Sequence, residues 1–237
     1  METNKYQTII DIKDNCVILG KEDDEKYSII ETMILSMAEK YKEDELIINV
    51  VDVLGYYLTN LINSNGDTIV PHNINMILAD SLDNFNKVLD SLISSIQERK
   101  KLFEEKQASN LEEYNEKSQD NKLPTVVTFL NNIGSEEYSI KLEEMLSESK
   151  EFGFYFVISD KSSINCYTEL YLQHCNIKVV INEYKDEFDK HLDYIIHKEL
   201  GELVIDDCSY AVIYYIPYIE CDRLNGLSNS IRKCDIF

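Results

Sequence analysis

Short β-branched or aromatic runs alternate along this chain with longer stretches of helical period, and this order constrains the fold more than any other feature. It is typical of βαβ units around a mostly parallel sheet. Several runs are almost wholly apolar, as strands covered on both faces should be. The predicted strands are Cys16 to Leu19, Leu46 to Val51, Met76 to Leu78, Val126 to Leu130, Phe154 to Ile158, Lys178 to Ile181, Leu203 to Ile205 and Ala211 to Tyr215.

Apolar stripes predict the helices between these strands, because residues three or four apart share one face of a helix. The first stripe consists of Ile30, Ile34, Met37 and Tyr41. A longer helix is predicted from about Leu82 to about Glu104, with the charged residues Glu98 to Lys101 facing outward and five apolar residues facing inward: Phe85, Leu89, Leu92, Ile96 and Phe103. The polar stretch from Glu105 to Lys122 predicts a loop or a frayed helical segment.

Composition limits the classes of partner. The formal net charge of −21 argues against binding DNA or RNA, because phosphate contacts need clustered Lys and Arg. The same acidity also suits general solubility. No apolar run approaches the roughly 20 residues that a membrane-spanning helix needs, so no direct membrane insertion is expected. The six cysteines lack the spacing of zinc ligands, which predicts reduced cytosolic thiols and no metal site.

The turn after the first predicted strand has the outline of a phosphate-binding loop. In a P-loop this junction reads G-x-x-x-x-G-K-[ST], so that backbone N–H groups and a helix N-terminus surround the phosphates. Gly20 and Lys26 fall at the matching positions, but Glu25 replaces the second glycine and Tyr27 replaces the magnesium-binding hydroxyl. The following helix is predicted to begin near Tyr27. We interpret Lys26 as a solvated charge at a helix start, in preference to a phosphate ligand.

The charge of this turn opposes phosphate binding. Between Gly20 and Tyr27 stand four acidic residues and two lysines. Each carboxylate about 6 Å from a phosphate contributes roughly 3 kcal/mol of repulsion at an effective dielectric constant near 20. Micromolar binding is worth only about 8 kcal/mol, so a few such repulsions cancel it. We therefore expect no cofactor, with ATP and magnesium bound weakly at most.

A second strand, followed by Asn131 and Asn132, has the form of a Walker B strand. In P-loop ATPases such a strand ends in Asp-Glu, where the Asp supports the magnesium and the Glu polarises the attacking water. Asparagine keeps the shape and the hydrogen bonds, but it carries no charge and cannot act as a base. We expect Asn131 and Asn132 to form local hydrogen bonds instead.

With these two strands the chain resembles the FtsK/SpoIIIE family of P-loop motors, and within it the degenerate C-terminal ATPase module of EssC-type coupling proteins of type VII secretion. The resemblance covers about residues 15–215 and leaves residues 220–237 as a C-terminal tail. Where the family has a Thr-Gln sensor pair, this chain has Asp160 and Lys161. Further landmarks in the family's order are Thr32, Ile34, Ser36, Ala38, the Glu43 to Leu46 segment, Asp52, Pro71-His72, Arg99, Leu102, Phe103, the Asn110 to Asn115 segment and Leu123-Pro124.

This resemblance implies an α/β fold of the RecA-like P-loop NTPase type, with a mostly parallel central sheet flanked by helices, as a single domain over residues 1–237. The losses at the P-loop, the Walker B strand and the sensor all fall on one active site, so the resemblance implies a catalytically inactive module. Its implied partners are the other ATPase modules of a membrane-anchored secretion motor and small helical secreted substrate proteins, on the cytoplasmic side of the membrane.

Two other interpretations stay open. Nucleotide could bind without being hydrolysed and regulate the same motor, held by Lys26 and the backbone of the loop. Alternatively, an unrelated hydrolase activity could occupy another pocket, although no nucleophile and base stand in a suggestive arrangement in the sequence.

Overall fold

The computed structural model describes residues 14–20, 23–52, 73–79, 81–118, 120–131, 139–160, 173–181, 198–204 and 210–215. Their strands form one eight-stranded sheet in the order β3-β2-β4-β5-β1-β6-β8-β7. All eight predicted strands are present, most of them longer than predicted. The strands are β1 (Cys16–Leu19), β2 (Leu46–Asp52), β3 (Asn73–Leu78), β4 (Thr125–Asn131), β5 (Phe154–Asp160), β6 (Ile177–Ile181), β7 (Lys198–Val204) and β8 (Tyr210–Tyr215).

The sheet is parallel over its first six neighbouring strands, from β3 to β6. Strand β8 is antiparallel to both β6 and β7, so the antiparallel pairs lie together at one side. The predicted α/β fold with a mostly parallel sheet is therefore confirmed. In a parallel sheet the carboxyl ends of all strands meet at one edge, which is where such folds place their ligands.

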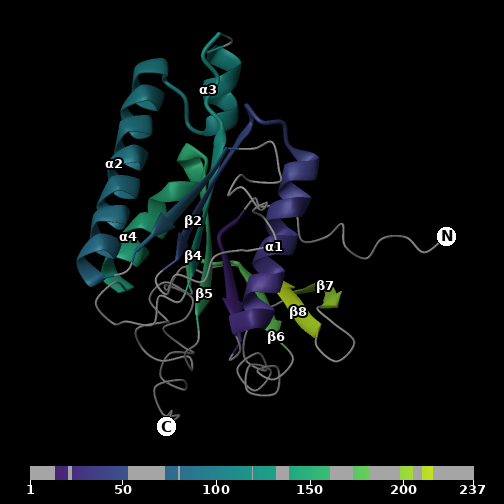
Figure 1. Cartoon of the computed structure of the whole chain (residues 1–237). Helices are drawn as coiled ribbons and strands as arrows, with labels where there is room; N and C mark the ends of the chain where they lie inside the picture. Colours follow the sequence, from purple (N-terminus) through teal and green to yellow (C-terminus); the bar gives the residue numbers. More distant parts are fainter. Residues whose placement is uncertain are drawn as a thin grey trace, which may run out of the picture.

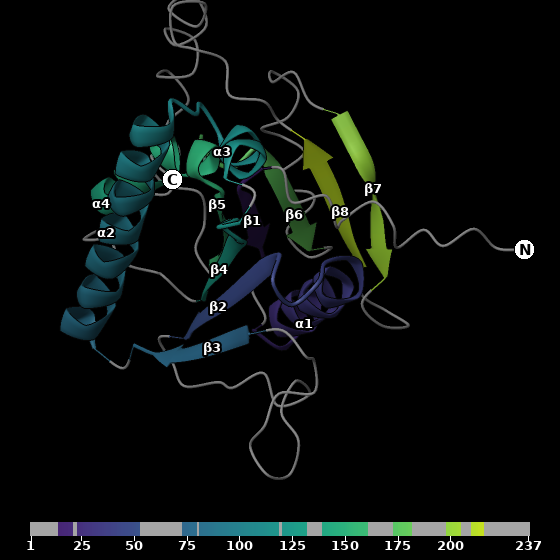
Figure 2. The same ribbon diagram turned by 90° about the horizontal axis from the view of Figure 1, so that it is seen from above.

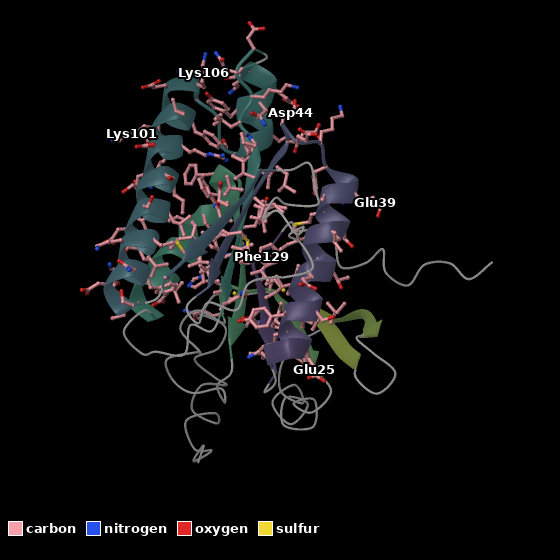
Figure 3. All side chains as sticks on the ribbon, viewed as in Figure 1. Glu25, Glu39, Asp44, Lys101, Lys106 and Phe129 are labelled. Carbon is pink, nitrogen blue, oxygen red and sulfur yellow. The ribbon has the colours of Figure 1, made fainter. Side chains whose placement is uncertain are left out.

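Helices cover both faces of this sheet (Figure 1; Figure 2). Helix α1 (Asp23–Lys40) covers one face, while α2 (Leu82–Lys106), α3 (Leu111–Lys117) and α4 (Ser139–Ser149) cover the other. The strands supply side chains alternately to the two faces: in β4, Phe129 packs on the α1 side (Figure 3), and Leu130 packs on the α2 side. The two-layered core confirms the predicted stripe of α1, since Ile30, Ile34 and Met37 are buried and Tyr41 packs against them.

Helix α2 follows its predicted pattern with one exception. Ser81 caps its first turn by accepting a hydrogen bond from the Asn84 backbone N–H, and the five apolar residues predicted to face inward are all buried. Glu98 and Lys101 are exposed as predicted, but Arg99 is buried, so the outward placement of this whole charged run was wrong. None of the helices in the described residues has the length and apolar character needed to cross a membrane.

Arg99 is buried because it closes the turn that leads into β5. Its Nη1 atom donates a hydrogen bond of 2.9 Å to the carbonyl oxygen of Phe152, and its guanidinium lies 4.5 Å from the centre of the Phe154 ring. Between these residues, Gly153 has a φ of 76°, and a side chain there would collide with Leu111. Burial lowers the pKa of the Arg99 guanidinium to about 10. The arginine therefore holds the 3₁₀ turn η4 (Lys150–Phe152) to α2.

The stretch after α2 is more ordered than the predicted loop or frayed segment, because it contains the capped helix α3. Asn110 accepts a hydrogen bond of 2.9 Å from the Glu113 backbone N–H. The buried Tyr114 stacks on Phe103 of α2 with 4.8 Å between the ring centres. Asn115 then bonds the backbone N–H and carbonyl of Leu123, at 2.8 and 2.9 Å. These contacts fix the chain at the point where it enters β4.

Arg99→Ala is expected to lower the free energy of unfolding by about 3 kcal/mol, because it leaves the buried Phe152 carbonyl without its charged donor and removes the contact with the Phe154 ring. Lys101→Ala, on the exposed face of the same helix, is the matched control and should change stability by less than about 0.5 kcal/mol. Urea denaturation followed by circular dichroism measures both. Equal effects of the two substitutions would contradict the structural role of Arg99.

Candidate functional site

The positions that the sequence singles out for nucleotide chemistry meet at the carboxyl edge of the parallel strands. Gly20 follows β1, Asn131 ends β4 and Asp160 ends β5. Strand β5 lies between β1 and β4, with Ser159 beside Asn131 in the register. Helix α1 starts at the same edge, where Glu25 lies in its first turn (Figure 3). The sheet thus brings together the elements from which P-loop proteins build their nucleotide site.

Helix α1 begins at Asp23, one turn earlier than the predicted start near Tyr27. The prediction was wrong because Asp23, Asp24 and Glu25 suit the first turn of a helix, where the helix dipole places partial positive charge. In a P-loop the backbone N–H groups of the loop are arranged around the phosphates. Here helical backbone occupies the second half of that stretch, so the loop between Gly20 and the helix is shortened.

The last three residues of the P-loop pattern, two of which are altered, take part in the interior of the protein. Lys26 is only 2% exposed, so its interpretation as a solvated charge was wrong. Glu25 is half-buried, and its Oε2 atom is buried with no hydrogen-bond partner among the described residues. Tyr27 is half-buried and packs against the core on the α1 side of the sheet. This ring is a packing element at the position where a P-loop has its magnesium-binding hydroxyl.

Gly20 is explained by packing within the sheet. A Cβ atom at this position would lie 2.5 Å from Cδ1 and 3.0 Å from Cγ1 of Ile181, the last residue of β6. A side chain here would require the Ile181 side chain to shift, so glycine suits the end of β1 at this distance from β6. The one P-loop glycine that the sequence retains therefore has a structural reason that requires no nucleotide.

Asn131 is fully buried at the end of β4. Its Oδ1 atom accepts a hydrogen bond of 3.2 Å from the Ser159 hydroxyl across the β4–β5 pair, so this bond is with a neighbouring strand and is not the predicted local one. Its Nδ2 atom has no hydrogen-bond partner among the described residues. Ser159 is the contact that sequence reasoning missed, although its place just before the expected sensor pair could have indicated it. The Walker B position thus holds a buried, neutral amide.

The structure describes the remaining predicted site residues only in part or not at all. Asn132 and Lys161 lie outside the described residues, and for Asp160 the structure describes the backbone alone. Within the described ranges, no group of His, Cys, Asp and Glu side chains is arranged to hold a metal ion. The described part of the site therefore contains a buried lysine and a buried amide, and no carboxylate at the end of β4 to hold magnesium.

A second polar cluster, which the sequence did not predict, lies at the opposite edge of the sheet, where β1, β5 and β6 begin. The Asp14 carboxylate accepts bonds of 2.6 Å from Lys150 Nζ and from Asn176 Nδ2. The fully buried Asn15 accepts a bond of 3.0 Å from the Phe156 backbone N–H and donates to two carbonyl oxygens at 3.3 Å. The polar residues Asp14, Asn15 and Asn176, just before β1 and β6, were the available signal. This cluster aligns the strand starts.

Two thiols beside this cluster are poor candidates for nucleophiles. Cys16 and Cys175 are free and buried. Burial raises the pKa of the Cys175 thiol to about 12, and it raises the pKa of Cys16 further above its ordinary value. Burial also lowers the pKa of Lys178, whose Nζ donates to the Cys175 carbonyl oxygen. Because a thiolate is the reactive form, these cysteines do not support the alternative of an unrelated hydrolase.

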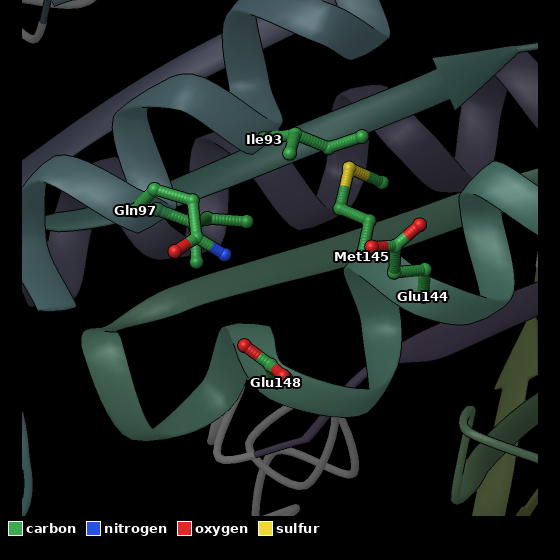
Figure 4. Close-up of a pocket in the computed structure, with 6 residues that line it drawn as sticks. Ile93, Gln97, Glu144, Met145 and Glu148 are labelled. Atoms are coloured by element: carbon green, nitrogen blue, oxygen red, sulfur yellow. The ribbon is translucent and has the colours of Figure 1, made fainter.

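A hollow between α2 and α4 also offers no site for a nucleotide (Figure 4). It holds about 20 Å³, which is room for about one water molecule. Its lining is formed by Ile93, Ile96, Gln97, Glu144, Met145 and Glu148. Two carboxylates in so small a space repel phosphate, so the hollow does not replace the altered edge.

Comparisons with known proteins agree with this architecture. The profile of the FtsK/SpoIIIE family matches residues 2–184. EssC (ATPases 2 and 3) from Geobacillus thermodenitrificans superposes with a TM-score of 0.61 at 21% identity, over 93% of this chain and 43% of that chain. EccC (ATPases 2 and 3) from Thermomonospora curvata, in complex with a signal sequence peptide, gives 0.58 at 14% identity, over 92% and 41%.

The monomer form of the pCW3 conjugation coupling protein TcpA, solved with ATPγS, gives a TM-score of 0.61 at 13% identity, over 94% of this chain and 67% of that chain. A search of curated protein sequences gave no match. At these identities the structural likenesses show the fold. The chain spans less than half the length of the EssC and EccC structures that it matches.

Gly20→Ala is expected to lower the free energy of unfolding by about 2 kcal/mol, because the added methyl group overlaps Ile181. Ile181→Val removes the nearest atom, Cδ1, so the double variant should lose less than the sum of the two single variants. The coupling is measured by thermal or urea unfolding of the four proteins in a double-mutant cycle. Additive losses would contradict the packing explanation for Gly20.

Proposed function

The chain belongs to the FtsK/SpoIIIE family, and on that premise we propose that it is a module of a type VII secretion motor that no longer hydrolyses ATP and acts through protein contacts. The observation that carries this proposal is the start of α1 at Asp23, which puts helical backbone where the phosphate cradle would be. A cradle shortened in this way has fewer backbone N–H groups to offer to a triphosphate.

The end of β4 supports the same conclusion. Hydrolysis in P-loop enzymes depends on a carboxylate near magnesium and on a residue that positions the attacking water. Asn131 has neither charge nor basicity, and its Oδ1 atom is engaged by Ser159. A buried amide in this place cannot compensate the charge of a magnesium ion. We therefore propose that the module has no catalytic residues and needs no metal.

We infer the partners of this module from its similarity to secretion motors. The EccC structure contains ATPases 2 and 3 of one chain and a signal sequence peptide. For this chain we propose the corresponding roles: contacts with neighbouring ATPase modules on the cytoplasmic face of the membrane, and contacts with small helical secreted proteins. The net charge of −21 supports protein partners over nucleic acid.

A second candidate function, binding of nucleotide without hydrolysis, is favoured by the burial of Lys26. In intact P-loops the lysine at this position contacts phosphate. The related TcpA was solved with ATPγS. Against this stand the acidic first turn of α1 and the neutral Asn131, which leave bound phosphates with little compensating charge.

The first test is direct. Titration calorimetry with Mg-ATP should give no binding heat for the unmodified protein. A thermal shift by ATP that vanishes in Lys26→Met, which keeps the length of the side chain, would instead support the second candidate.

Restoring the P-loop residues should not restore catalysis. The double variant Glu25→Gly/Tyr27→Ser regains the second glycine and the hydroxyl, but Asn131 and Asn132 still cannot hold magnesium or act on water. We expect phosphate release no faster than from a blank without protein. Glu31→Gly/Tyr41→Ser, the same changes within α1 and directly after its last residue, is the control away from the carboxyl edge. Turnover in the first variant but not in the control would overturn the proposed loss of catalysis.

A further inference from the structure

Strand β3 forms one edge of the sheet (Figure 2), and its described residues carry none of the protective features that such edges usually have. Within the described residues it pairs on one side only, with β2. Edge strands commonly carry charged residues or proline, which discourage the addition of a further strand. The β3 sequence, Asn-Ile-Asn-Met-Ile-Leu, contains neither, although 28% of the whole chain is charged. Its outer backbone groups can therefore accept another strand.

A row of polar side chains runs from the interior of the sheet to this edge. Thr128, Asn49 and Asn75 are neighbours in the register of β4, β2 and β3, and all three are on the face covered by α2. Asn49 Nδ2 donates to Thr128 Oγ1 at 3.3 Å, and Asn75 Nδ2 donates to Asn49 Oδ1 at 2.9 Å. Thr128 is buried and Asn75 is exposed. The ladder thus ends on an exposed side chain with its Oδ1 acceptor still available for a donor.

Apolar side chains flank the end of the ladder. Ile74 and Met76, on the α1 face, and Ile77, on the α2 face, are each only half-buried, whereas their neighbours in β2 are more deeply covered. An added strand would cover them with side chains of its own at alternate positions. The edge therefore specifies a pattern: a hydrogen-bonding side chain opposite Asn75, with apolar residues on either side of it.

We propose that the β3 edge binds an extended polypeptide segment of a partner protein as an additional strand. The central residue of this segment is Asn, Gln, Ser or Thr, whose side chain donates a hydrogen bond to Asn75 Oδ1. The residues on either side of it are apolar, and the segment contains no acidic residues. Main-chain hydrogen bonds provide affinity in this mode of recognition, and the side chains provide selectivity. The inference rests on the proposed function, since it names one surface through which a module without catalysis would make its contacts.

The net charge of the chain argues against a second copy of this protein as the partner at the β3 edge. The sequence of β3 itself contains an asparagine between apolar residues, so two copies could pair through their edges. However, each copy carries a net charge of −21, and an edge-to-edge pair has little buried area to offset the repulsion. A basic segment is attracted to the same surface, and a neutral one is not repelled by it.

The test uses the full chain and two short synthetic peptides, with lysines at both ends and either asparagine or valine at the centre of a valine run. Binding is followed by fluorescence anisotropy. The asparagine peptide should bind more tightly than the valine peptide, and Asn75→Val should remove that difference, because the two asparagines are coupled. Asn75→Lys should weaken binding of both peptides about tenfold or more. Gln97→Lys, which adds the same charge on α2, should not.

Two results of the binding experiment would overturn the proposal: no saturable binding of either peptide, or equal binding to the Asn75→Lys and unmodified proteins. A dimer in sedimentation velocity that Asn75→Lys abolishes would also overturn it, because a second copy would then occupy the β3 edge. None of these results depends on nucleotide. The absence of catalysis can thus hold while the edge proposal fails, and ATP turnover would leave the peptide results unchanged.

Discussion

The parallel register of β4, β5 and β1 is the constraint on which the rest of the structure depends. It places the ends of three strands at one edge and sets Asn131 beside Ser159. The close approach of Gly20 to Ile181 extends the same packing to β6. Because a shift of one residue would exchange the two faces of a strand, both layers of the core hold this register in place. The arrangement of a nucleotide site is thus kept by packing, whether or not a nucleotide is bound.

The carboxyl edge has the architecture of a nucleotide site, but its side chains differ from those of a P-loop ATPase. The groups that would face phosphate and magnesium are a buried lysine, a half-buried glutamate and a buried amide. Two buried polar atoms, Glu25 Oε2 and Asn131 Nδ2, have no hydrogen-bond partner among the described residues. Such atoms cost stability, and native proteins contain few of them. They fit a module that keeps the outline of an ATPase and has changed its use.

Much of the fold could be predicted because the spacing of apolar residues along the sequence indicates which side chains are buried. The eight strands and the inward face of α2 follow from apolar patterns that tertiary structure merely confirms. Arg99 could not be predicted to be buried, since its partner, the Phe152 carbonyl, is distant in sequence. The early start of α1 depends on acidic residues that resemble a loop when they are counted only as charges. The Asp14 cluster likewise depends on contacts between segments far apart in the chain.

The central claim is that the carboxyl edge no longer receives a triphosphate. Two-dimensional NMR of the isotopically labelled protein, titrated with Mg-ATP, tests it at the residues concerned. The account predicts that the backbone amide signals of Gly20, Lys26 and Ser159 stay in place up to millimolar nucleotide. Saturable shifts of these three signals, absent for residues on α3, would show an occupied phosphate site and contradict the account.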